Sequence, residues 1–111
     1  MKTRLGVLTT ATTLAFSGAV LAQQLDAGQA EGLMTKAGCQ ACHAIDKKMV
    51  GPAYKEVAKK YKGDAKAPET LFQKVRAGGS GAFGPVPMPP NPPTKIGDDD
   101  LKKLVAWILA Q

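Results

Sequence analysis

The sequence has few of the residues that build disulfide frameworks or clusters of metal ligands, since its 111 residues include two cysteines and one histidine. Both cysteines fall within one four-residue stretch and none is left over, so a disulfide framework is excluded. Aromatic residues make up only 5% of the chain. Although the formal net charge is +6, no arginine-rich stripe or ladder of aromatic side chains accompanies it. The composition therefore predicts no nucleic-acid partner.

The N-terminal segment has the features of a secretory signal peptide. Lys2 and Arg4 precede an uncharged, mostly apolar run over 5–21, and Ala22 follows as a small residue at the expected cleavage point. Threonine and serine interrupt this run, which makes it a poor spanning helix, and we expect no stable membrane anchor. We predict that 1–22 is a cleaved signal peptide and that 23–111 is a single exported, periplasmic domain. Removing Lys2 and Arg4 lowers the formal net charge from +6 to +4.

Residues 39–43, Cys-Gln-Ala-Cys-His, form the C-x-x-C-H run that is typical of a c-type haem attachment site. Two thiols at this spacing can add to the two vinyl groups of one porphyrin, and the histidine directly after them can bind the iron. A C-x-x-C pair alone also occurs in zinc and dithiol redox sites. We predict one haem c, covalent through Cys39 and Cys42 with His43 as an iron ligand; a structural or redox cysteine pair is the alternative.

Met88 is the candidate for the second iron ligand. His43 is the only histidine, so ligation by two histidines of this chain is impossible. Met88 lies 45 positions further on, within 84–93, a stretch of ten residues with six prolines. Prolines exclude a helix or a central strand there, and a stiff, extended strap can hold a thioether at a low cost in entropy. With both axial positions closed, the iron would pass electrons rather than bind substrates. We expect Met34 to lie in the core and Met49 to be a packing residue.

Four segments carry apolar residues at helical spacing, over 25–37, 54–61, 68–77 and 98–109. Glycines follow the first and third segments, and three aspartates open the last one, where they favour a helix N-terminus. Trp107, the only tryptophan, is expected in the core against the first helix. No internal repeat and no strand-like alternation of useful length is present, so the predicted fold class is all-α.

Three stretches resemble, in this order, the small bacterial class I cytochromes c of the cytochrome c-551 type: 36–46, 49–54 and 84–91. The resemblance covers nearly all of the predicted mature chain. It implies a small cytochrome c fold, with about four short helices wrapped around one covalently attached haem. It also implies a soluble electron carrier without catalytic residues, shuttling in the periplasm between a membrane cytochrome complex and a terminal reductase, such as a nitrite reductase, or an oxidase. We expect a monomer.

The resemblance also implies roles for two residues beside the iron ligands. The Pro52 carbonyl would accept a hydrogen bond from the ring N–H of His43, and Asn91 would form a hydrogen bond near the Met88 sulfur. Many relatives have a tryptophan or an arginine near a haem propionate where this chain has Phe83 and Lys74. Other departures from the family pattern are Met34, where a phenylalanine is usual, and the additional residues Pro92 and Pro93.

The lysines near the haem motif indicate what kind of partner the protein would bind. Lys36, Lys47 and Lys48 are close in sequence to the haem motif and are candidates for a rim that docks on acidic surfaces of redox proteins.

Two other functions are alternatives to an electron carrier. A ligand-binding or peroxidatic haem protein, in which Met88 leaves the iron, is the first, and carbon monoxide binding distinguishes it. A thiol oxidoreductase using Cys39 and Cys42 is the second; the chain lacks the βαβ pattern of such folds, and titration of free thiols would identify it.

Overall fold

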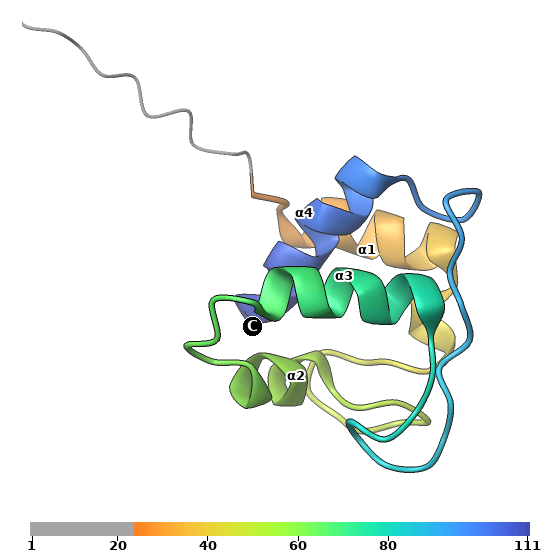
Figure 1. Ribbon diagram of the computed structural model, residues 1–111. Coiled ribbons are helices and arrows are strands. Elements are labelled where there is room, and N and C mark those ends of the chain that lie inside the picture. The colour runs from red at the N-terminus through yellow and green to blue at the C-terminus, as the bar shows by residue number, and fades with distance from the viewer. Residues whose placement is uncertain (1–23) are drawn as a thin grey trace, which may run out of the picture.

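The computed structural model describes residues 24–111, so the predicted signal peptide 1–22 lies outside the described residues. Within this range four α-helices follow one another, and a single turn of 3-10 helix comes directly after the first (Figure 1). These are α1 (Ala27–Ala37), η1 (Cys39–Ala41), α2 (Tyr54–Lys60), α3 (Ala67–Ala77) and α4 (Asp98–Leu109). Between 24 and 111, β structure is limited to one isolated bridge, so the predicted all-α class is confirmed. No helix in this range is long and apolar enough to cross a membrane.

Both ends of α1 are fixed by local sequence. The Asp26 side chain accepts a hydrogen bond from the Gln29 backbone N–H, and the Gln29 side chain accepts one from the Asp26 N–H, which forms a capping box. At the other end Gly38 has φ 79°, a left-handed conformation that glycine adopts without steric cost. The helix therefore ends where predicted, immediately before the two cysteines.

The last helix, α4, packs against each of the other three α-helices, and in Figure 1 it crosses α1. Its buried face consists of Leu101, Leu104, Val105 and Trp107. Trp107 is 7% exposed and meets the Tyr54 ring edge-on, with the ring centroids 6.3 Å apart. The predicted core positions of Trp107 and Met34 are thus confirmed, although the aromatic neighbour of Trp107 belongs to α2.

The prediction that Met49 is a packing residue was wrong, because this side chain is 44% exposed. The backbone explains the difference: the Met49 N–H donates to the Gly51 carbonyl at 3.0 Å, and the Gly51 N–H donates to the Cys42 carbonyl at 2.8 Å. These two bonds fold 49–51 into a tight turn against the haem motif. The turn leaves Met49 and its neighbour Val50 on the surface.

The proline-rich strap forms neither helix nor strand, as predicted, and runs beside the end of α3 toward α4 (Figure 1). Gly79 and Met88 exchange two backbone hydrogen bonds of 2.9 Å each. Three residues later, the Asn91 N–H donates to the Val75 carbonyl at 3.0 Å. The bond from Asn91 also satisfies a carbonyl that the last turn of α3 cannot pair within the helix. The strap is therefore attached to the end of α3 at two points.

Candidate haem-binding site

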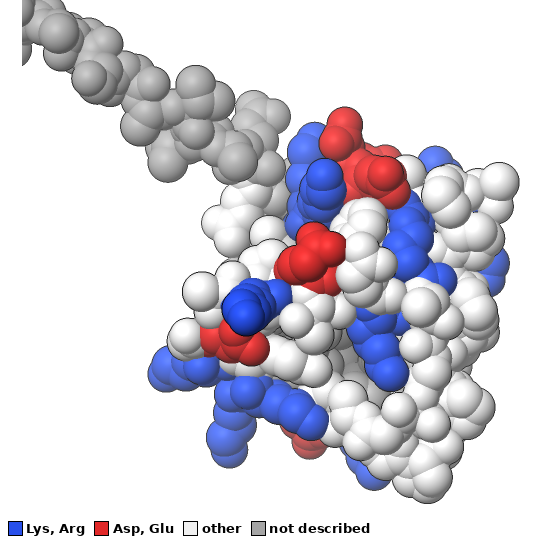
Figure 2. Space-filling view, in the orientation of Figure 1, with Lys and Arg blue, Asp and Glu red and all other residues white. Residues whose placement is uncertain are grey.

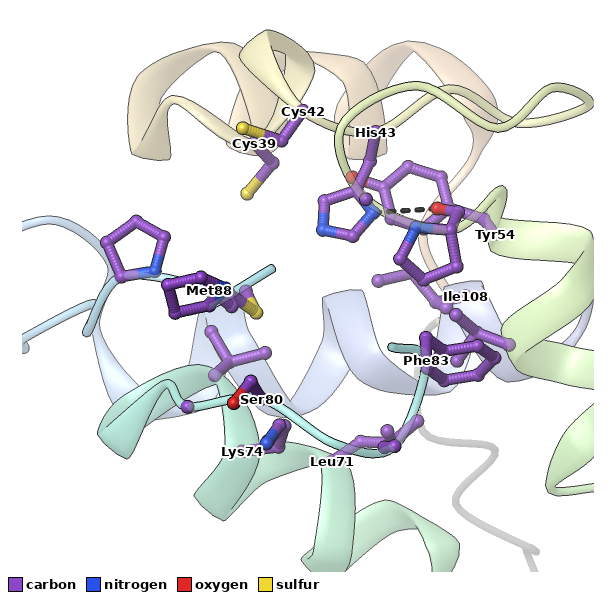
Figure 3. Close-up of a pocket in the computed structure, with 18 of the residues that line it drawn as sticks. Cys39, Cys42, His43, Tyr54, Leu71, Lys74, Ser80, Phe83, Met88 and Ile108 are labelled. Atoms are coloured by element: carbon purple, nitrogen blue, oxygen red, sulfur yellow. Dashed lines mark hydrogen bonds between the residues drawn. The ribbon is translucent and has the colours of Figure 1, made fainter. Parts of the chain in front are cut away.

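A large apolar cavity lies between the helices and the strap, and it holds about 1140 Å³ of space when the part open to solvent is included. Cys39, Cys42, His43, Pro52 and Met88 all line it (Figure 3). Most of the remaining wall is apolar, with Leu71, Leu101, Leu104 and Ile108 among its residues. The fold thus brings five of the six predicted site residues to one cavity. Asn91 is the exception: it belongs to the strap but does not line the cavity.

The two cysteines reach the cavity from the η1 turn. The N–H groups of Cys42 and His43 both donate to the Cys39 carbonyl, at 3.2 and 3.0 Å, and this tight turn places both cysteine side chains on one side of the cavity (Figure 3). The two cysteines are not joined to each other by a disulfide. Burial raises the pKa of the Cys39 thiol above its usual value, although the positive charge of Lys95 partly opposes this effect. Because both side chains lie on one side of the cavity, they are placed to hold a group bound inside it.

The His43 ring is held in one orientation and one tautomer. Its Nδ1 lies 2.8 Å from the Pro52 carbonyl oxygen. A carbonyl only accepts hydrogen bonds, so Nδ1 carries the proton, and Nε2 keeps a free lone pair with which to bind a metal. The Tyr54 ring stacks on the imidazole, with the centroids 5.2 Å apart. The hydrogen bond implied by the family resemblance is thus present in the structure.

Gly51 leaves no room for a side chain beside this imidazole, because a Cβ there would lie 2.6 Å from His43 Cε1 and 2.9 Å from Nδ1. We expect Gly51→Ala to displace the ring and to lower the free energy of unfolding by about 1–3 kcal/mol, the usual cost of overpacking. Denaturant unfolding of the holoprotein measures the change. Gly28→Ala in α1, whose Cβ meets only an ordinary contact at 3.5 Å, is the control. Equal stabilities for the two variants would contradict the steric argument.

Met88 approaches the cavity from the strap and is half-buried. Its thioether and the His43 imidazole come from different segments and both point into the cavity (Figure 3). The backbone bonds to Gly79 fix the strap at this residue. The structure therefore places two potential iron ligands around the same space.

The Asn91 side chain anchors the strap to the end of α3. Its Nδ2 donates to the carbonyls of Val75, at 3.2 Å, and Pro89, at 3.1 Å. The residue is 5% exposed, so these bonds satisfy a buried amide. Asn91 holds the strap against α3, which positions Met88 through the backbone.

Two of the residues that depart from the family pattern, Phe83 and Lys74, lie at the cavity. Phe83 is 36% exposed, and Lys74 lines the cavity. The role of Lys60 was not identified from the sequence; its ammonium lies 4.6 Å from the Phe83 ring centroid and donates to the Ala82 carbonyl. This contact spans 22 residues, so no local pattern predicts it. Lys60 ties α2 to the loop that carries Phe83.

One buried polar atom tests whether haem suits this cavity. The Tyr54 hydroxyl is buried without a hydrogen-bond partner, and both burial and the nearby Cys39 raise the pKa of Tyr54, so the hydroxyl keeps its proton. A buried donor without a partner is costly in a folded protein. A bound group with polar atoms could supply the missing acceptor, while the apolar wall suits a large hydrophobic ring. Together with the two thiols, these features fit haem.

Comparisons with known proteins agree with this geometry. The cytochrome c family model matches residues 27–111. The chain is 48% identical over 99 residues to cytochrome c-551 of Pseudomonas aeruginosa, which covers 89% of this chain and 92% of the relative. It is 53% identical over 77 residues to cytochrome c2 of Rubrivivax gelatinosus, covering 69% of this chain and 91% of that protein. The crystal structure of Nitrosomonas europaea cytochrome c552 superposes with a TM-score of 0.67 at 42% identity, covering 72% and 96% of the two chains.

Proposed function

Since the chain belongs to the cytochrome c family and carries the haem c of that family through Cys39 and Cys42, we propose that it is a periplasmic mono-haem electron carrier without enzymatic activity. The observation that supports this function is the convergence of His43 and Met88 on one cavity beside the two cysteines. In this proposal 1–22 is the signal peptide that directs export, and 23–111 is the cytochrome c domain.

The residues around the cavity would hold the haem and supply the ligands of its iron. When bound, haem c supplies an iron that cycles between Fe(II) and Fe(III). His43 is the proposed proximal ligand, oriented by its hydrogen bond to Pro52. Met88 is the proposed second ligand, and its soft thioether favours Fe(II) and so raises the reduction potential. With both side chains bound to it, the iron would have no position open to substrates.

The binding of carbon monoxide to the reduced protein tests whether His43 and Met88 both ligate the iron. Ligation by both His43 and Met88 predicts that the reduced protein resists carbon monoxide at neutral pH, while it exchanges electrons rapidly with a small redox protein. Immediate formation of a carbon monoxide complex would favour a ligand-binding haem protein instead. A full count of two free thiols in protein made by a host that attaches haem c would favour the thiol oxidoreductase.

The surface around the cavity mouth suits brief docking of a redox partner. Val50, Phe83 and Val86 line the cavity and are also exposed, which gives the mouth an apolar rim. Lys47 and Lys48 are exposed in the loop shortly before Val50, and Figure 2 shows further positively charged side chains gathered over α2. An apolar contact surrounded by positive charge is suited to an acidic partner, here a membrane cytochrome complex, a nitrite reductase or an oxidase.

Reversing the charges at Lys47 and Lys48 tests the docking rim. We expect the double variant Lys47→Glu, Lys48→Glu to react about tenfold more slowly with an acidic redox partner at low ionic strength, and the difference to shrink as salt is added. Stopped-flow measurements across a salt series give these rates. The control reverses the charges of Lys102 and Lys103, which are exposed on α4 and do not line the cavity. Equal rates for the two double variants would contradict a docking rim at the cavity mouth.

A further inference from the structure

The Arg76 side chain lies where α3, the strap and α4 meet, and it is only 13% exposed. Its Nη1 donates to the backbone carbonyls of Asn91, at 3.0 Å, and Ile96, at 2.8 Å. Its Nη2 lies 2.6 Å from Oδ1 of Asp98, and the guanidinium carbon lies 5.3 Å from the Phe72 ring centroid. One side chain therefore joins α3 to partners 15 to 22 residues further along the chain.

The two carbonyls that Nη1 binds are the two ends of a single turn over 91–96. Within this turn the Lys95 N–H donates to the Pro92 carbonyl at 2.9 Å. Asn91 and Ile96 are 5% and 2% exposed, so their carbonyls have little access to water if Arg76 is withdrawn. We call the gap between these two ends, at Asn91 and Ile96, the neck of the turn. Arg76 closes this neck by binding both carbonyls.

A short and stiff segment connects this neck to Met88, so a displacement of one would move the other. Only Pro89 and Pro90 separate Met88 from Asn91. Each proline ring fixes φ near −65°, so few backbone angles remain that could absorb a displacement. A shift of Asn91 away from α3 would therefore move Met88 as well.

We propose that Arg76 is a positioning residue for Met88: by closing the neck of the 91–96 turn, it keeps the thioether in the cavity and slows its release from the iron. The inference rests on the proposed ligation by Met88. Lysine cannot reproduce this role, because the acceptors belong to three different residues. A planar guanidinium presents several N–H groups to them in a fixed fork, whereas an ammonium is a point charge on a flexible stem.

The variant Arg76→Lys tests the proposal in the ferric holoprotein, since it preserves the charge and removes the fork. Two signals are followed through a guanidinium chloride titration: the weak far-red absorption band of methionine sulfur on ferric iron, and the circular dichroism of the helices. We expect the band to disappear at a lower denaturant concentration than the helical signal. We also expect imidazole to displace Met88 at least about tenfold faster than in the wild type, because hydrogen bonds from a charged donor are lost.

Val105→Ala is the matched control, because Val105 is 1% exposed in α4 and does not line the cavity. This variant loses core packing, and its two signals should move together. Asp98→Asn weakens only the Nη2 contact and should accelerate imidazole binding by a smaller factor than Arg76→Lys. The proposal is overturned if both signals of Arg76→Lys move together as in Val105→Ala and the imidazole rate is unchanged. A wild type with bound haem but no far-red band contradicts Met88 ligation itself, and with it the proposed function.

Discussion

Replacing Met88 by alanine is expected to abolish the far-red band of the ferric protein and to lower the reduction potential by on the order of 0.1 V or more, part of the roughly 0.8 V over which axial ligands shift haem potentials. The sign follows from the chemistry of the ligand: a thioether favours Fe(II), so its loss favours Fe(III) and the potential falls. The reduced variant should also bind carbon monoxide rapidly, because one axial position is open. Potentiometric titration and visible spectra measure these changes.

Met49→Ala is the matched control for this substitution. Met49 lies in the loop after the haem motif but is 44% exposed and does not line the cavity. Its removal should leave the band, the potential and the resistance to carbon monoxide as in the wild type. If Met49→Ala abolished the band and Met88→Ala preserved it, the proposed ligand would be the wrong methionine.

Gly78→Ala is expected to lower the free energy of unfolding by about 3 kcal/mol or more, through backbone strain and overlap together. Gly78 has φ 68° and ψ −153°, a combination that is almost restricted to glycine. A Cβ at this position would also overlap the Met88 carbonyl oxygen and lie 2.9 Å from the Pro89 carbonyl carbon. The side chain would therefore push the strap away from α3 at the residue that carries the proposed ligand. Denaturant unfolding measures the loss, and the far-red band should weaken in parallel.

Gly32→Ala provides the comparison for the same chemical change. Gly32 lies within α1, and a Cβ there would meet nothing within 4 Å. Alanine is the better helix former, so this variant should be more stable than the wild type by about 0.5–1 kcal/mol. An unchanged stability and an intact far-red band in Gly78→Ala would show that the close approach of the strap to Gly78 is not required.

The parts of the fold that were predicted correctly depend on local signals. Apolar spacing and the glycine at 38 locate α1 and its end, and the acidic first turn locates the start of α4. Likewise, the spacing of Cys39, Cys42 and His43 suffices to predict the attachment site, because these residues act within one turn. Such signals can be recognised in a sequence because the interacting groups are only a few residues apart.

The features that sequence reasoning missed depend on contacts between distant segments. Arg76 binds carbonyls 15 and 20 residues away, and these are backbone acceptors that any residue type would supply. The Asn91 side chain similarly donates to the Val75 carbonyl, 16 residues away. Met49 is the local exception: it was misplaced because the hydrogen bonds that turn it outward are formed by its own backbone and that of Gly51. Partners of this kind leave no pattern of residue types along the chain.

The optical spectrum of the purified mature holoprotein, recorded oxidised and reduced, tests the central claim most directly. The account predicts the sharp reduced bands of a covalent haem c that resists acid–acetone extraction, together with the far-red band in the oxidised protein. Haem bands without the far-red band would contradict ligation by Met88 and favour ligand binding. The absence of covalent haem in protein from a host able to attach it would contradict the assignment of the cavity as a haem site.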